Sequence, residues 1–265
     1  MKYECDAWKR EFEAYDLCRH FSSRTRALYT PENQMLTIHV GLQKTGSTAV
    51  QRSLAGMTRE ELRGVHYRGK ESAANNDGFF NLFSPGFQVP RRADRTPTVK
   101  LLEKGHHVVL SEEALLGRPV APHMDEIYGQ GVSSAAAMRD YFGDKTPFQV
   151  VIYLRTQYEW LESLFNERAK LGTVALDSTE FAERSLKAQY FHWTRLIKDL
   201  KEELGPDRLI VRPYEPSVNA IADFLNVLEI PTPQRFLSPN PENRSVTGNE
   251  LALAQRLADS LRAAG

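Results

Sequence analysis

The sequence predicts an α/β fold with three layers, in which helices cover both faces of a central parallel sheet. The first observation is that short apolar runs alternate with amphipathic helical patterns over most of the chain. The second is the run FQVVIYL at 148–154, which is almost continuously apolar and has β-branched members, as in a strand buried on both faces. This alternation implies parallel strands joined by right-handed crossovers, with ligands bound beyond the carboxyl ends of the strands.

The individual elements follow from apolar spacing and from the residues that begin or end helices. Strands are expected at 36–40, 65–67, 106–110, 148–154 and 209–211. Helices are expected from about Ser47, at 58–64, from Pro97, and at 133–142, 157–171, 187–204 and 218–228. A further amphipathic helix at about 7–22, in an N-terminal helical extension of residues 1–34, would pack on the domain or on a partner, for example in a homo-oligomer. No linker interrupts the chain, so residues 1–265 are expected to form one domain.

Composition limits the classes of partner. The 265 residues are 41% hydrophobic, which is enough for a large core, and 34 basic residues balance 34 acidic ones. No overall charge would therefore recruit nucleic acid or an anionic membrane. The two cysteines, Cys5 and Cys18, fit a reducing compartment better than a disulfide framework. No run approaches the roughly 18 apolar residues of a membrane span, so the protein is expected to be soluble and cytoplasmic, without a transmembrane segment.

A phosphate-binding loop is the strongest local signal. The stretch 35–54, MLTIHVGLQKTGSTAVQRSL, predicts a strand, a tight loop between Gly41 and Gly46, and a helix. Glycines let backbone N–H groups turn inward, and the helix N-terminus attracts an anion. The loop nearly matches G-x-x-x-x-G-K-[ST], but Ser47 stands where the lysine belongs and Lys44 lies three positions earlier. The loop is thus P-loop-like but unlike that of a plain ATPase or GTPase. The alternative is an ordinary turn whose hydroxyls cap a helix.

A second anion site is expected at the end of the strand 148–154. Arg155 follows this strand directly, and residues 156–159 form a capping-box pattern that opens a helix. Ser163 lies about two helical turns further on, and its side chain can lean back toward the helix N-terminus. Arginine suits bidentate phosphate binding. The alternative is that Arg155 pairs with a carboxylate and that Ser163 is incidental.

Three motifs together, IHVGLQKTGSTAVQRSL, YLRTQYEWLESLFNE and VRPYEPS, resemble the sulfotransferases that use 3′-phosphoadenosine 5′-phosphosulfate (PAPS), especially the bacterial carbohydrate and lipid type. The resemblance runs from about residue 35 to the C-terminus. It implies that a Lys-Thr-Gly-Ser-Thr loop binds the 5′-phosphosulfate, and that an arginine and a serine eight positions apart bind the 3′-phosphate. The residues implicated are Lys44, Thr45, Gly46, Ser47 and Thr48 in the first role, Arg155 and Ser163 in the second, Tyr214 near the adenine, and Arg244 against the 3′-phosphate.

The acceptor hydroxyl needs a general base, for which the sequence leaves alternatives. Glu113 is the first choice, because the LSEEAL stretch resembles the Ser-Ser-Glu segment of the family at a strand's carboxyl end. Glu112 is its rival. His66 is a third candidate, since histidine titrates near neutral pH and this one is expected to follow another strand.

The sequence thus predicts an enzyme that moves a sulfuryl group from PAPS to a hydroxyl of a carbohydrate, a glycolipid or a small metabolite. This chemistry requires no metal. The first alternative is a P-loop phosphotransferase of the nucleotide-kinase kind, which should carry lysine at position 47 and an aspartate that holds magnesium. The second is a catalytically silent nucleotide-binding scaffold.

Overall fold

The computed structural model describes residues 35–69, 97–113, 115–117, 119, 127–142, 146–170, 178–215 and 218–237. The helix expected at 7–22 and the candidate Arg244 lie outside the described residues.

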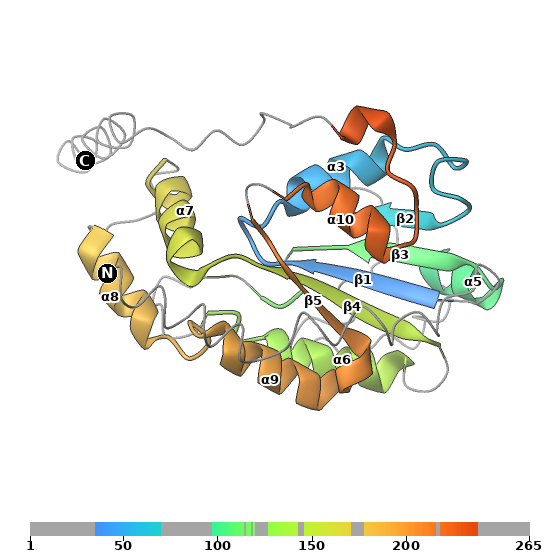
Figure 1. The fold of residues 1–265 in the computed structure, drawn as a ribbon. Coiled ribbons are helices and arrows are strands. Elements are labelled where there is room, and N and C mark those ends of the chain that lie inside the picture. Colours follow the sequence, from blue (N-terminus) through green and yellow to red (C-terminus); the bar gives the residue numbers. More distant parts are fainter. Residues whose placement is uncertain are drawn as a thin grey trace, which may run out of the picture.

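Five parallel strands form one sheet in the order β2-β3-β1-β4-β5, which confirms the expected central parallel sheet (Figure 1). The bounds are β1 Met35–Gly41, β2 His66–Gly69, β3 His107–Ser111, β4 Phe148–Leu154 and β5 Leu209–Pro213. β1 is buried along its whole length and β4 along nearly all of it. Their apolar runs therefore form the centre of the sheet, as parallel strands covered on both faces do.

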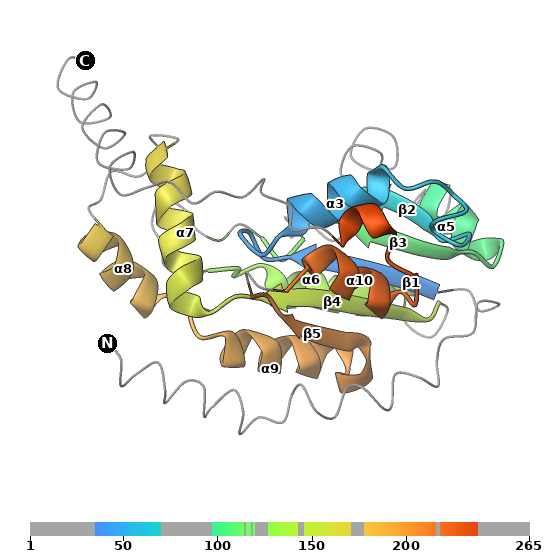
Figure 2. The same ribbon diagram turned by 45° about the horizontal axis from the view of Figure 1, so that its top comes forward.

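Helices cover both faces of the sheet, so the fold is a three-layer α/β/α structure (Figures 1 and 2). The helices are α3 Ser47–Ala55, α5 Pro97–Glu103, α6 Gly131–Phe142, α7 Gln157–Lys170, α8 Ser178–Lys187, α9 Trp193–Leu204 and α10 Ala220–Val227. The helices α3 and α10 pack in one core with alternate residues of the strands, and α5, α6 and α9 pack in the other. α7 stands at the end of the sheet where β4 ends.

Two helical expectations need correction. Thr58 and Glu61 do form the expected capping box, in which each backbone N–H donates to the side chain of the other, but residues 59–64 form turns rather than a helix. The helix expected at 187–204 begins only at Trp193, because a turn separates it from α8. That turn buries Phe191, and apolar spacing alone does not distinguish a buried turn from a buried helix.

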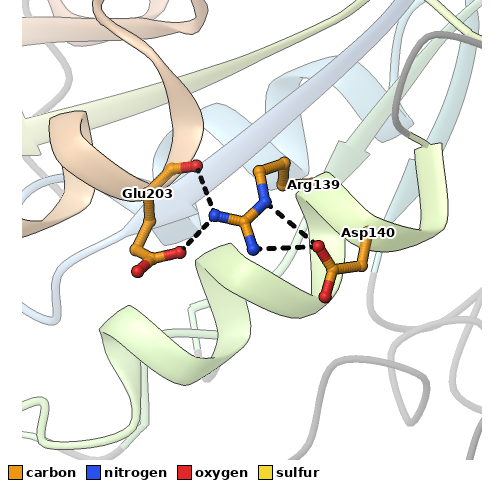
Figure 3. A network of polar contacts seen from close by, with 3 residues as sticks. All are labelled: Arg139, Asp140 and Glu203. Atoms are coloured by element: carbon orange, nitrogen blue, oxygen red, sulfur yellow. Dashed lines mark hydrogen bonds and ion pairs between the residues drawn. The ribbon is translucent and has the colours of Figure 1, made fainter.

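An ion-pair network joins α6 to α9 (Figure 3), on the face of the sheet away from α3 (Figure 1). Arg139 donates to the carboxylate of Glu203 at 2.6 Å, and also to the carboxylate of its neighbour Asp140 at 2.9 Å. The Arg139 side chain is 42% exposed, and exposed ion pairs contribute only about 0.2–1 kcal/mol. The apolar packing between these helices therefore outweighs the network in holding α9 on the sheet.

Candidate functional site

The phosphate loop and Arg155 lie at the same edge of the sheet. β1 and β4 are hydrogen-bonded neighbours, and their register places Gly41 level with Tyr153. The loop begins directly after Gly41, and Arg155 follows two residues after Tyr153. Neighbouring strands are about 4.8 Å apart, so the two expected anion sites begin side by side at the carboxyl edge.

Two positions of the loop require glycine, because neighbouring side chains leave no room for a Cβ and because Gly46 has a positive φ. A Cβ at position 41 would lie 1.9 Å from the Ser47 hydroxyl oxygen. Gly46 has φ 79° and precedes α3 as its N-cap. A Cβ at position 46 would lie 2.8 Å from Cε2 of Tyr214. The loop therefore folds back on itself at Gly41, while Gly46 lets the Tyr214 ring pack against the start of α3.

The peptide groups of Gln43 are held by two buried aromatic side chains. The Gln43 N–H donates to the hydroxyl oxygen of Tyr128 at 3.0 Å, and the indole N–H of Trp160 donates to the Gln43 carbonyl at 3.0 Å. The next residue, Lys44, has φ 67°, which is uncommon for a side chain of this size. The surrounding bonds thus hold the loop in a turn that Lys44 would otherwise disfavour.

The ammonium of Lys44 lies 3.3 Å from a carboxylate oxygen of Glu167 on α7. Both side chains are about one-third exposed, at 30% and 38%. The sequence analysis did not predict Glu167, although its spacing from Ser163 along the helix could have indicated it. It lies four residues after Ser163, and residues four apart share a helix face.

Arg155 has three described contacts. Its side-chain Nε lies 3.5 Å from a carboxylate oxygen of Glu159, and its carbonyl accepts a hydrogen bond of 2.8 Å from the indole N–H of Trp193. Its guanidinium carbon lies 6.0 Å from the centre of the Tyr214 ring, within reach of a cation–π interaction. The carboxylate expected to cap α7 therefore pairs with Arg155 instead, which is the alternative that the sequence left open for this arginine.

Ser163 lies between the two carboxylates on one face of α7. Glu159, Ser163 and Glu167 follow one another at intervals of four residues, and the first and last pair with Arg155 and Lys44. This face of α7 therefore runs from one cation to the other. Lys44, Arg155 and Tyr214 thus lie around the carboxyl edge of the sheet, and Ser163 lies on the face of α7 whose carboxylates pair with the two cations.

The two candidate glutamates differ in where they lie. Cγ of Glu113 would be 3.3 Å from a Cβ placed on Gly41, so its side chain lies beside the loop. Burial raises the pKa of the Tyr128 hydroxyl, and the charge of Glu113 adds to this rise, which places the carboxylate near Tyr128 as well. Glu112 is buried, and its N–H donates to the carbonyl of His39 in β1.

His66 lies away from this site. It begins β2 rather than following a strand, and its register places it level with Val108 and thereby with Leu36. Leu36 precedes Gly41 by five residues, which is on the order of 16 Å along a strand. Burial, followed by the charge of the neighbouring His106, lowers the pKa of His66. The prediction that His66 follows a strand is therefore wrong, because His66 lies at the amino end of the sheet.

Two buried histidines lie within the sheet, one in β1 and one at the start of β3. His39 of β1 is hydrogen-bonded through Nδ1 to the hydroxyl of Ser111 at 2.8 Å, and Nε2 of His107 bonds to Thr37 at 2.9 Å. Burial lowers the pKa of each histidine from 6.5 to about 4. Both are therefore neutral at neutral pH in the folded protein.

These histidines predict a loss of stability in acid. Between pH 6.5 and about 4 the unfolded chain binds a proton at each histidine and the folded protein does not, so stability falls as pH falls through this range. The loss reaches about 3 kcal/mol per histidine only as the pH falls to the folded-state pKa of about 4, so part of it is present at about pH 5. Urea unfolding at about pH 7 and about pH 5 measures it. In His39→Asn, the free energy of unfolding should differ less between the two pH values, by the contribution of one histidine. An unchanged difference would contradict the role assigned to His39.

Within the described residues, no group of three or more histidine, cysteine, aspartate or glutamate side chains could hold a metal ion. The described helices also include none of the length and apolar character needed to cross a membrane.

No family model and no curated protein sequence matches the chain. Solved structures do match, among them a sulfotransferase from Alicyclobacillus acidocaldarius at 15% identity and TM-score 0.43, covering 87% of this chain and 93% of that one. A thymidylate kinase from Ehrlichia chaffeensis matches at 16% identity and TM-score 0.36, covering 74% and 99%. Polyphosphate kinase 2 from Arthrobacter aurescens TC1 matches at 14% identity and TM-score 0.34, covering 97% and 88%. At such identities the similarity concerns the fold alone.

Proposed function

We propose that this protein is a sulfotransferase that moves a sulfuryl group from PAPS to a hydroxyl of a carbohydrate, a glycolipid or a small metabolite. The observation that carries the proposal is the meeting of Lys44 and Arg155 at one edge of the sheet, on either side of Ser163. A ligand with phosphate-like groups at two ends suits two such cations. The likeness of the three sequence motifs to the PAPS-dependent family supports the same ligand.

The residues of the site fit this donor. Gly46, the N-cap of α3, carries no side chain that could cap this helix, and an uncapped helix N-terminus suits an anion. The positions 44–48 would bind the 5′-phosphosulfate, and Arg155 with Ser163 would bind the 3′-phosphate. The ring of Tyr214, held between Gly46 and the Arg155 guanidinium, would contact the adenine. Arg244 is proposed for the 3′-phosphate from its motif alone.

The donor supplies an activated sulfuryl group, whose sulfur–oxygen bond to phosphate breaks as the acceptor oxygen bonds to sulfur. Lys44 would stabilise the negative charge that develops on the bridging oxygen, since its ammonium belongs to the loop that binds this end. Glu113 would accept the proton of the acceptor hydroxyl, because its side chain is the candidate that lies beside Gly41. Glu112 remains the rival base, and the position of His66 at the far end of its strand argues against a proton transfer by that residue.

Calorimetric titration with adenosine 3′,5′-bisphosphate, and separately with ATP and magnesium, tests the proposal. We expect the bisphosphate to bind more tightly, and Arg155→Ala to weaken it by about 10- to 100-fold, because charge-assisted hydrogen bonds contribute about 1.5–3 kcal/mol. Arg184→Ala is the matched control, since Arg184 lies on α8 and pairs there with Glu180. Tighter binding of ATP with magnesium would favour the phosphotransferase instead.

Measuring turnover distinguishes a sulfotransferase from a catalytically silent nucleotide-binding scaffold. A sulfotransferase should consume PAPS faster when hydroxyl acceptors are added, with formation of a sulfate ester. Tight bisphosphate binding without transfer to any acceptor in a broad panel of sugars, glycolipids and phenols would indicate a silent nucleotide-binding protein.

A further inference from the structure

A cluster of three buried aromatic side chains connects the backbone of the phosphate loop to the backbone of Arg155. Tyr128, Trp160 and Trp193 are at most 2% exposed. The two indole rings meet in a T-shaped arrangement with centroids 5.0 Å apart, and the Tyr128 ring lies 6.1 and 6.3 Å from them. These three residues are named the aromatic bridge.

The polar atoms of the aromatic bridge point to the two anion-binding segments. Tyr128 accepts from the Gln43 N–H, and Trp160 donates to the carbonyl of the same residue. Trp193 donates to the carbonyl of Arg155. An indole N–H has only a donor to offer and is costly to bury unpaired, so each tryptophan needs one acceptor. In both cases that acceptor is a main-chain carbonyl at or next to a candidate ligand-binding residue.

The geometry around the bridge is also strained. Tyr128 has φ 52°, a left-handed conformation that a bulky side chain adopts rarely. Such a conformation persists where the surrounding contacts require it. At Tyr128 the requirement is met by burial in the core and by the hydrogen bond to Gln43.

We infer that Trp160 and Trp193 are positioning residues that set the separation between the phosphate loop and Arg155, and thereby select a nucleotide by the spacing of its two anionic groups. This inference rests on the proposed function. Trp160 fixes the loop end through Gln43, Trp193 fixes the Arg155 end, and the edge-to-face contact of the two indole rings keeps the two ends at one distance. Small displacements of binding groups are costly, because a misplacement of about 1 Å can lower a rate about 100-fold.

The test compares adenosine 3′,5′-bisphosphate with adenosine 5′-monophosphate, which lacks the 3′-phosphate. Trp193→Phe keeps an aromatic ring and removes the N–H that holds Arg155. We expect it to weaken bisphosphate binding about 10-fold, the effect of one lost hydrogen bond of about 1.4 kcal/mol, while monophosphate binding stays within about twofold. Trp160→Phe removes the N–H that holds the loop end, so it should weaken the binding of both nucleotides.

Phe142→Leu is the control for a loss of core packing alone. Phe142 is 3% exposed and ends α6, and its ring contacts those of Tyr141 and Phe148. This variant should lower the melting temperature and leave the ratio of the two affinities as in the wild type. If Trp193→Phe behaves like Phe142→Leu, the bridge is ordinary core and the inference is wrong.

A measurement without nucleotide separates this inference from the proposed function. Amide hydrogen exchange at Gln43 should be faster in Trp160→Phe and in Tyr128→Phe, which removes only one oxygen, than in Phe142→Leu. Exchange that is equally fast in all variants would overturn the positioning role. If the wild type shows no preference for the bisphosphate, the proposed function and the selection of spacing both fail, and exchange then decides only whether the bridge fixes the loop.

Discussion

Replacing Lys44 with alanine is expected to lower the turnover of PAPS about 100- to 1,000-fold, which is the cost of removing one preorganised group that stabilises developing charge. Binding of adenosine 3′,5′-bisphosphate should weaken much less, because this spent nucleotide lacks the sulfuryl group and is still held by Arg155. Steady-state rates and calorimetry on the same preparations measure the two effects. Equal losses in turnover and in binding would mean that Lys44 contributes to nucleotide binding and not to the chemical step.

Two further variants test whether the effect is specific to Lys44. Lys198→Ala is a control for the loss of a lysine, since Lys198 lies on α9 with a side chain that is 73% exposed, and it should change neither quantity. Glu167→Gln removes the carboxylate 3.3 Å from the Lys44 ammonium. If a phosphate competes with Glu167 for this cation, Glu167→Gln should bind the bisphosphate at least as tightly as the wild type at low salt. Weaker binding would mean that Glu167 is needed to orient Lys44.

Replacing Glu113 with glutamine is expected to lower transfer about 100- to 10,000-fold, the usual contribution of a general base. Nucleotide affinity should remain close to that of the wild type, because the substitution keeps the shape of the side chain and removes only its ability to accept a proton. The pH profile of turnover is the second readout, since the limb that reports the base should disappear.

Glu112→Gln is the matched control for Glu113→Gln, one residue earlier in the same segment. Glu112 is 7% exposed, so its substitution is expected to lower stability rather than turnover per folded molecule. A normal rate in Glu113→Gln, together with a large loss in Glu112→Gln, would assign the proton transfer to Glu112.

The sequence predicted the sheet closely where the signal was local. The run 148–154 coincides with β4, and the loop between Gly41 and Gly46 is followed by α3 at Ser47 as expected. Apolar periodicity and glycine placement act over a few residues, so they are readable without knowledge of the rest of the chain. The same local reading failed at His66, where the start of a strand was taken for a position beyond its end.

The contacts that complete the candidate site were not readable in this way. Trp160 and Gln43 are 117 residues apart in the chain, and Glu167 and Lys44 are 123 apart. Their meeting depends on the placement of α7 beside the phosphate loop. Capping propensity favoured a bond between Glu159 and its own helix, but the nearby guanidinium of Arg155 is the partner that Glu159 has in the structure.

The sequence by itself therefore determined the layered α/β architecture, the strand-loop-helix segment around Gly41 and Gly46, and the position of Arg155 at a strand end, because each depends on patterns within one segment. Only the tertiary structure decided which strands are neighbours, which carboxylates face Lys44 and Arg155, and how the aromatic bridge joins their backbones. The physical reason is that the order β2-β3-β1-β4-β5 is set by packing of all helices and strands together, and side chains far apart in the chain meet only once that order is fixed.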